Sequence, residues 1–137
     1  MEQLDLLGLV KATQMLERNA NVALMYSGLR IPQYRLLDLL ARCGQATVSE
    51  MGAALHITRA TASVMINELI RSGSLVTDEH PSDRRSFHIR LTDHGLQRLQ
   101  SARSDLAVLT RKTSQRYPQE IVRVLNEFVQ AVLERQS

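Results

Sequence analysis

The sequence predicts a mainly α-helical fold with one small β-hairpin, which places it in the α+β class. Apolar residues recur at the spacing of an amphipathic helix over most of the chain, and only 4% of the residues are aromatic. The spacing changes to strict alternation in one short region, residues 75–91. A chain of 137 residues fits one domain and can bury about 68% of its unfolded surface, so we treat residues 1–137 as a single domain.

The first two helices are predicted from apolar stripes and from the residues that end them. Residues 4–27 carry a broad apolar face, and Gly28 follows it. Pro32 suits the first turn of a second helix, because proline is favoured where a helix begins. We expect that helix to run to about Arg42 and to end in residues 43–46.

Two shorter helices are expected next, with a tight turn between them. Ser49 is the expected N-cap of the first, which residues 56–57 break. Thr58 is the expected N-cap of the second, over residues 58–72, and Gly73 ends it. The face of the second helix that should be buried carries Ala62, Met65, Ile66 and Leu69.

A β-hairpin is predicted where the apolar period falls from about 3.6 residues to about 2. Residues 75–79 form the first expected strand and residues 86–91 the second, in which Phe87, Ile89 and Leu91 share one face. The turn between the strands carries two adjacent arginines at its tip.

The terminal helices carry more apolar surface than one chain can cover. Thr92 should cap a long helix, and Pro118 should open a last helix that reaches about Arg135. The apolar residues of this last helix wrap well beyond the ~100° that a core-facing stripe needs, and the first helix is similarly broad. We therefore expect residues 1–28 and 93–137 to form a homodimer; the alternative is a three-helix packing inside one chain.

Two short helices, a glycine and a hairpin with a basic tip form the pattern of a winged helix-turn-helix, which we place at residues 31–92. Residues 83–92 read Asp-Arg-Arg-Ser-Phe-His-Ile-Arg-Leu-Thr, and Gly95 follows. This segment resembles the wing signature of the multiple antibiotic resistance regulator (MarR) family, which is an Asp, any residue, an Arg, five residues and then Leu-Thr. Residues 57–61 and 69–76 resemble the recognition helix of that family and its exit.

The resemblance implies a homodimeric transcription factor, usually a repressor. The single cysteine and the lack of a secretion-signal pattern or membrane span predict a cytoplasmic protein. In this family the terminal helices dimerise, and each winged core binds one half-site of a double-stranded operator. A small effector molecule, often aromatic or lipophilic, then releases the DNA.

The recognition helix at residues 58–72 is expected to enter the major groove with the face opposite its apolar stripe. Asn67 can pair bidentately with adenine, Ala60 or Val64 can contact thymine methyl groups, and Arg59 is placed for a backbone phosphate. The expected contact residues of this helix are Arg59, Ala60, Thr61, Ser63, Val64 and Asn67.

The same helix departs from the family in one respect. Many members have basic residues at the positions of Val64 and Glu68, where this chain has an apolar and an acidic residue. Residues 56–92 carry five arginines and four acidic residues, a balance of +1, so nonspecific DNA binding should be modest. An alternative therefore stays open: a winged-helix module for protein contacts, or an effector-independent regulator that binds DNA weakly.

The wing at residues 80–86 is expected to reach the minor groove, where the potential is most negative over narrow A·T tracts. Arg85 is the residue that we expect to insert there, oriented by Asp83, while Arg84 meets phosphate. A solvated hairpin with a local Asp–Arg pair is the alternative. Arg90 points outward on the second strand and could add a phosphate contact.

The net charge of +3 and the isoelectric point near 9.5 favour an anionic partner, although many proteins without a nucleic-acid function share them. Of the 17 basic residues 15 are arginine, which suits phosphate and guanine edges but is also enriched by a GC-rich genome. There is no phosphate loop, dinucleotide fingerprint or nucleophile elbow, so we expect neither an enzyme nor a cofactor. There is also no apolar run of the ~20 residues that a membrane span needs.

The sequence assigns no sensing role to its single cysteine or to two histidines near the wing, and it gives only a general location for an effector pocket. The single cysteine, Cys43, is expected to be a buried structural thiol. His80 and His88 flank the wing, but without a full ligand set we expect no metal there. An effector pocket should lie where the terminal helices meet the winged core, and plausible lining residues are Met15, Met25, Tyr26, Tyr34 and Met51.

Overall fold

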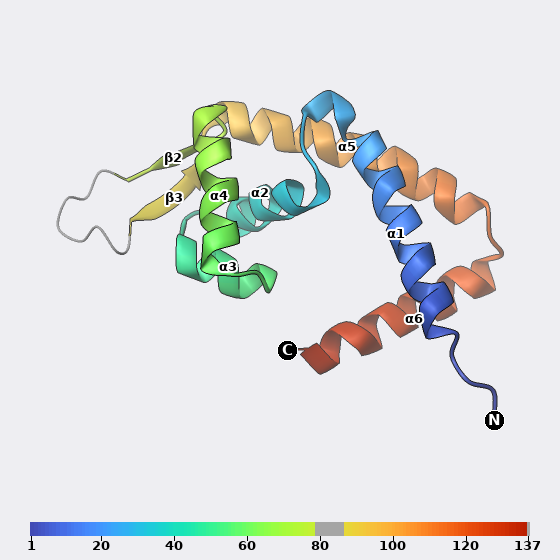
Figure 1. Cartoon of the computed structure of the whole chain (residues 1–137). Coiled ribbons are helices and arrows are strands. Elements are labelled where there is room, and N and C mark those ends of the chain that lie inside the picture. Colours follow the sequence, from blue (N-terminus) through green and yellow to red (C-terminus); the bar gives the residue numbers. More distant parts are fainter. Residues whose placement is uncertain (79–86, 137) are drawn as a thin grey trace.

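The computed structural model describes residues 1–78 and 87–136 (Figure 1). In Figure 1 the hairpin leaves the body on one side of α4, while α1, the second half of α5 and α6 extend away on the other side. The elements in chain order are α1 (Leu6–Ala23), the 3₁₀ helix η1 (Met25–Ser27), α2 (Ile31–Cys43), β1 (Ala46–Thr47), α3 (Val48–Leu55), α4 (Arg59–Arg71), β2 (Leu75–Thr77), β3 (His88–Leu91), α5 (Asp93–Gln115) and α6 (Gln119–Gln136). The α+β fold class is confirmed.

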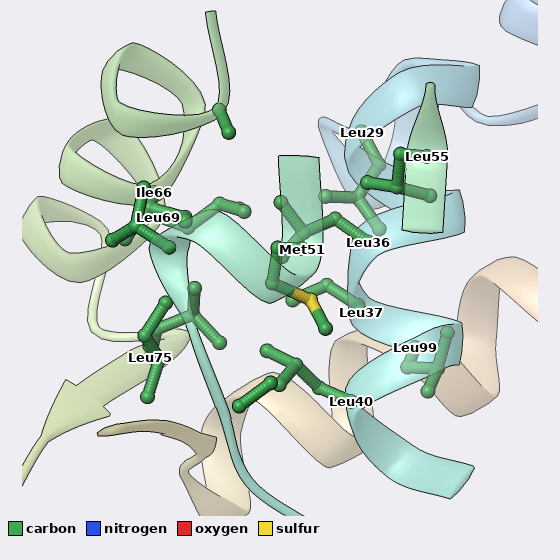
Figure 2. Close-up of a cluster of buried hydrophobic side chains, with 14 of the residues drawn as sticks. Leu29, Leu36, Leu37, Leu40, Met51, Leu55, Ile66, Leu69, Leu75 and Leu99 are labelled. Carbon is green, nitrogen blue, oxygen red and sulfur yellow. The ribbon is translucent and has the colours of Figure 1, made fainter. Parts of the chain in front are cut away.

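The hydrophobic core lies between α2, α3, α4, the sheet and the first half of α5 (Figure 2). Figure 2 shows Met51 of α3 directed toward Leu37 and Leu40 of α2. The buried positions follow the apolar stripes because a helix that packs on a core buries residues three and four apart. They include Leu36, Leu37, Leu40, Met51, Leu55, Ala62, Ile66, Leu69, Leu75, Ile89, Leu99 and Ala102.

The sheet has three short antiparallel strands in the order β1-β3-β2. Ala46 of β1 pairs with Ile89 of β3, and Leu75 of β2 pairs with Leu91. Ile89 is fully buried, so the middle strand fixes the hairpin to the core. β2 and β3 confirm the hairpin, although both strands are shorter than expected, and β1 was not predicted.

The start of α3 is a correction, because Thr47 and not Ser49 is its N-cap. The Thr47 hydroxyl accepts a hydrogen bond from the Glu50 amide at 3.1 Å, and the Glu50 carboxylate accepts one from the Thr47 amide at 3.4 Å. This reciprocal pair satisfies two free amides at once, which a cap at Ser49 cannot do with these partners. The predicted cap of α4, Thr58, is confirmed by its 3.1 Å hydrogen bond from the Thr61 amide.

The first predicted helix, over residues 4–27, is divided in the structure. α1 ends at Ala23, and η1 leads the chain into Gly28, whose φ of 71° is left-handed. Such a φ strains a residue with a Cβ, so the glycine allows the chain to turn toward α2. Gly73, at φ 77°, ends α4 in the same way, as predicted.

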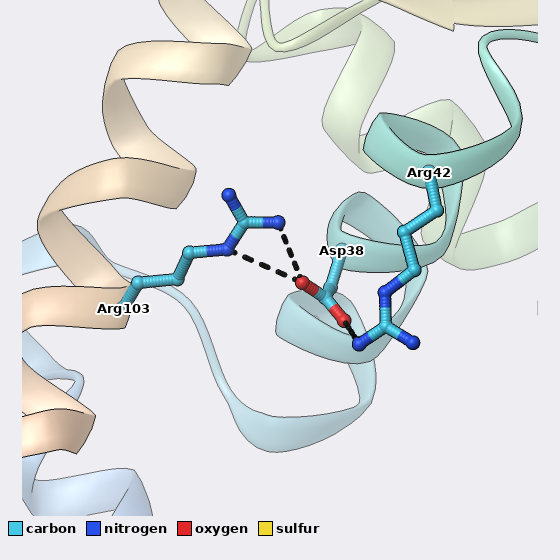
Figure 3. A network of polar contacts seen from close by, with 3 residues as sticks. All are labelled: Asp38, Arg42 and Arg103. Atoms are coloured by element: carbon cyan, nitrogen blue, oxygen red, sulfur yellow. Dashed lines mark hydrogen bonds and ion pairs between the residues drawn. The ribbon is translucent and has the colours of Figure 1, made fainter.

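Asp38 of α2 joins the winged core to the long helix α5 (Figure 3). Its Oδ1 accepts from Arg103 Nη2 of α5 at 2.7 Å, and its Oδ2 accepts from Arg42 Nη2 at 2.6 Å. The hydrogen bond with Asp38 raises the pKa of Arg103. Because Arg42 lies four residues from Asp38 on the same helix, only the Arg103 pair fixes one element relative to another.

Candidate nucleic-acid interface

The turn between α3 and α4 sets the direction of the exposed helix α4. His56 ends α3 with a left-handed φ of 55°, and the Ile57 amide donates to the Gly52 carbonyl at 3.0 Å. A Cβ on Gly52 would lie 3.2 Å from the Ile57 carbonyl oxygen, so the small residue permits this close turn. The two helices therefore pack as a helix-turn-helix pair.

α4 is amphipathic, and the structure places its predicted contact residues opposite the core. Ala62, Ile66 and Leu69 are buried, as predicted, and Met65 is half-buried. Of the predicted contact residues, Ser63 is half-buried, while Arg59, Ala60, Thr61, Val64 and Asn67 are exposed. One face of α4 is thus free to meet a partner.

Hydrogen bonding at the start of α4 leaves the hydroxyl donor of Thr61 unused in the cap. Thr58 Oγ1 donates to Thr61 Oγ1 at 2.9 Å, so the Thr61 hydroxyl hydrogen is not used in that bond. Thr61 itself is exposed. Its hydroxyl can therefore donate to a phosphate or to a base edge.

The charge of this face is small. Arg59 and Arg71 stand at the two ends of α4, and Glu68 lies exposed between them. An acidic side chain on a helix face repels phosphate, but it can accept a hydrogen bond from cytosine N4. This face therefore offers little electrostatic attraction to phosphate.

At the base of the wing, Arg90 of β3 is engaged within the protein. Its Nε lies 3.2 Å from Asp78 Oδ1, and its side chain is half exposed. The predicted phosphate contact of Arg90 thus competes with this ion pair. The predicted wing residues Asp83, Arg84 and Arg85, and also His80, lie outside the described residues.

Cys43 is a further correction, because the structure exposes this thiol that we expected to be buried. It continues the spacing of Leu36 and Leu40, but it is the last residue of α2, where the helix has already passed the core. Gly44 follows in open space with φ 83°. In residues 1–78 and 87–136 no three His, Cys, Asp or Glu side chains gather closely enough to hold a metal.

The five side chains considered for an effector pocket do not come together. Met51 belongs to the core, and Tyr34 packs half-buried against it. Met15 lines a groove between α1 and the end of α5. Met25 and Tyr26 are exposed on η1.

Arg98 of α5 is a residue that the sequence analysis missed. Its Nε donates to the Ser27 carbonyl at 2.6 Å, and its Nη1 donates to Ser74 Oγ at 3.0 Å and to Ser72 Oγ at 3.2 Å. The sequence signal that could have identified Arg98 is its position next to the buried stripe of Gly95, Leu99 and Ala102. A single guanidinium thereby joins the connection after α1 to the end of α4.

The helix-turn-helix pair, the third helix α2 and the antiparallel hairpin define a winged helix-turn-helix protein. The sequence model of the MarR family matches residues 27–86. Together with the fold, this match supports the resemblance to the MarR family that the wing and the recognition helix predicted.

Individual proteins and solved structures are also similar to this chain. An uncharacterised HTH-type transcriptional regulator of Bacillus subtilis, YkoM, is 31% identical over 68 residues, which are 50% of this chain but only 44% of that protein. The crystal structure of a MarR-family transcription regulator superposes with a TM-score of 0.77 at 26% identity, covering 95% of this chain and 88% of the other. The transcriptional repressor CouR, bound to a 23-mer DNA duplex, has a TM-score of 0.85 at 23% identity, with 95% and 92% covered.

No helix in residues 1–78 and 87–136 combines the length and the apolar character that crossing a bilayer requires.

Proposed function

We propose that the chain is a homodimeric, sequence-specific regulator of transcription that binds double-stranded operator DNA, represses, and is released by a small effector. Residues 31–92 form the DNA-binding core, and residues 1–28 and 93–137 form the dimer. The observation that carries this proposal is the exposed face of α4, which lies opposite the buried residues Ala62, Ile66 and Leu69. A regulator, and not an enzyme, is the class that such a face supports.

In the proposed complex, α4 lies in the major groove and residues 80–86 enter the adjacent minor groove. Asn67, exposed near the middle of α4, reads adenine, and Val64, which is 59% exposed, contacts a thymine methyl group. Arg59 and the Thr61 hydroxyl hold the backbone. A dimer would place two such helices about one DNA turn apart, ~34–36 Å, on a palindromic site.

The exposed apolar surface of the terminal helices supports the dimer. No side chain of α6 in its described residues is buried, although the helix is strongly amphipathic. The exposed large apolar residues of α6 are Ile121, Val124, Leu125, Phe128, Val129, Val132 and Leu133. A second copy that covers these residues and the apolar face of α1 would remove this surface from water.

The experiment that tests the proposal is an electrophoretic shift on the intergenic DNA beside the coding region, with salt varied. We expect a specific complex whose affinity falls as salt rises, and whose release by added aromatic acids reveals the effector. Equal affinity for unrelated DNA at every salt concentration would instead support the weakly binding or protein-interaction alternative that Glu68 keeps open.

Asn67→Ala should weaken operator binding by about 1–3 kcal/mol at one base pair, because a bidentate contact to adenine is lost there. The measurement is affinity for a set of operators, each with one substituted base pair. Asn126→Ala is the matched control, since Asn126 is an exposed asparagine on α6. A loss of equal size on all operators would show that Asn67 contacts the backbone instead.

Arg85→Ala should lower operator affinity and reduce the preference for A·T pairs at the minor-groove position, because an arginine favours the narrow groove of such tracts. Binding to operators with A·T or G·C pairs at the flanks measures this preference. Arg111→Ala on α5 serves as the control for loss of one positive charge. Operator affinity that does not change in Arg85→Ala would remove the wing from the mechanism.

A further inference from the structure

The carboxylate of Asp38 on α2 is held by two arginines, one on each of its oxygens (Figure 3). Oδ2 accepts from Arg42 Nη2, four residues along the same helix, at 2.6 Å. Oδ1 accepts from Arg103 of α5, from Nη2 at 2.7 Å and from Nε at 3.3 Å. The Asp38 side chain is 18% exposed, whereas that of Arg103 is 41% and that of Arg42 is 73% exposed. A mostly covered carboxylate thus binds one arginine within its helix and one across to α5.

Arg103 lies near the outer limit of the contact between α5 and the winged core. The buried residues of α5 are Gly95, Leu99 and Ala102, and Leu106 is the last residue of this helix that packs against the core. Beyond Leu106 the helix extends away from the body, as Figure 1 shows, and leads into α6. The Asp38–Arg103 pair is therefore placed where the winged core and the terminal helices separate.

An ion pair fixes the angle between α2 and α5 more strictly than their apolar contact does. Burial of leucine side chains stabilises any arrangement that removes a similar area from water, because the hydrophobic effect has no direction. A guanidinium that donates to a carboxylate requires a defined position of both groups. The hydrogen bond with Asp38 also raises the pKa of Arg103, so the charged form of this arginine is favoured. The pair thus selects one orientation of α2 on α5.

We propose that Asp38 and Arg103 are a positioning pair, which fixes the orientation of the winged core on α5 and thereby the spacing of the two operator half-sites. This inference rests on the proposed function. α2, α3 and α4 share one hydrophobic core, so the orientation of α2 on α5 also determines that of α4. In a dimer of the terminal helices it sets the distance between the two copies of α4. Neighbouring base pairs are about 3.4 Å apart, so a small change in this distance alters the preferred spacing.

The exposure of the pair determines how large an effect to expect. A partly exposed ion pair shifts an equilibrium by up to about fivefold, and a dimer contains two copies of the pair. Loss of both copies should therefore reduce the preference for the correct spacing by about 5- to 25-fold. Arg42 cannot contribute to this preference, because it and Asp38 are on the same helix.

Operator binding tests the role in spacing. The site variant is Arg103→Met and the matched control is Arg42→Met, because each removes one arginine from the same carboxylate and only the first breaks a link between helices. Electrophoretic shifts measure affinity for operators whose half-sites are moved together or apart by about one or two base pairs. We expect Arg103→Met to lose most of the preference for one spacing, and Arg42→Met to keep it.

A distance within one chain tests the orientation without DNA and without a dimer. Cys43, the single cysteine, is exposed at the end of α2 and takes one spin label, and Lys112→Cys provides a second label on the far half of α5. Labelled protein is mixed with an excess of unlabelled protein, so pulsed electron paramagnetic resonance reports the distance within one copy. We expect a narrow distribution in the otherwise unaltered chain and a broader or shifted one in Arg103→Met. Arg35→Met, an exposed position of α2, is the control here because Arg42 is next to the label.

An unchanged label distance in Arg103→Met would overturn the positioning role, and so would an equal change of spacing preference in Arg103→Met and Arg42→Met. Asp38→Asn is the second site variant; it keeps the size of the side chain, removes its charge and should reproduce the effect of Arg103→Met. Circular dichroism verifies that each variant folds. If the chain binds no specific DNA at any salt concentration, the proposed function is rejected, while the label distances still decide whether the pair orients the winged core.

Discussion

Phe128→Glu in α6 should make the protein monomeric and lower its affinity for a palindromic operator by about 100-fold or more. The substitution places a carboxylate within the apolar face that we propose a second copy covers, and burying an unpaired charge costs several kcal/mol. Losing the dimer also makes each half-site bind by itself, and linked binding of two sites commonly contributes a factor of about 10² to 10⁴.

Within one chain, no described residue of α6 is buried. Phe128 is 36% exposed with no partner copy present, and its apolar neighbours on the helix are more exposed still. Such a helix has little to hold it in a monomer, since helical stability comes mainly from packing an apolar face. The fold of residues 31–92 does not depend on it, because the core is formed by other elements.

Light scattering coupled to size exclusion measures the oligomeric state, and an electrophoretic shift measures operator binding. Asn126→Glu is the control, because it adds the same charge on the same helix at an exposed position among polar residues such as Arg123 and Gln130. A Phe128→Glu protein that remains dimeric would place the interface elsewhere. A monomer with full operator affinity would show that dimerisation is not needed for recognition.

Most features set by neighbouring residues were predictable from the sequence, although the N-cap of α3 was not. Thr58 and Gly73 delimit α4 because a hydroxyl that accepts from the helix amide and a left-handed glycine both act within a few residues. The apolar stripe of α4 likewise repeats within one helix, so its buried and exposed faces follow directly. The predicted surface of the recognition helix therefore agrees with the structure, although its contacts with DNA remain a prediction.

Features set by the tertiary arrangement were not predictable. Arg98 and Ser27 are 71 residues apart, and no local pattern pairs them. β1 has two residues, too few to show an alternation, and it exists because it pairs with β3. Cys43 has the spacing of a buried residue, but whether the core extends that far depends on the neighbouring elements and not on α2 itself.

Gly95→Ala should lower the free energy of unfolding by about 3 kcal/mol or more, which is more than we expect for Gly8→Ala. A Cβ at Gly95 would lie far inside contact distance of the Ser74 carbonyl oxygen, 2.9 Å from the Ser74 carbonyl carbon and 3.2 Å from Leu91 Cδ2. The carbonyl is backbone and is held by a 3.1 Å hydrogen bond from the Thr92 amide, so it cannot rotate away. Overpacking of this kind typically costs about 1–3 kcal/mol, and more where the obstacle is rigid.

Gly8→Ala is a closely matched control. Gly8 and Gly95 are each the third residue of a helix, and each donates its amide to the N-cap side chain at 3.0 Å, Gly8 to Asp5 and Gly95 to Thr92. The obstacle to a Cβ at Gly8 is the Asp5 carboxylate, the end of a flexible and exposed side chain. Alanine favours a helix by about 1 kcal/mol over glycine, so Gly8→Ala should change stability by no more than about that amount.

Urea unfolding followed by circular dichroism, at one fixed protein concentration because dimer stability depends on it, compares the two variants. The expected result is a clear fall in the unfolding midpoint for Gly95→Ala and little change for Gly8→Ala. Since Ser74 also accepts from Arg98, a shift of its backbone should loosen the end of α4 as well. Equal stability of the two variants would mean that α5 can move away from Ser74 at little cost, and that the close approach at Gly95 does not hold the start of the hairpin to α5.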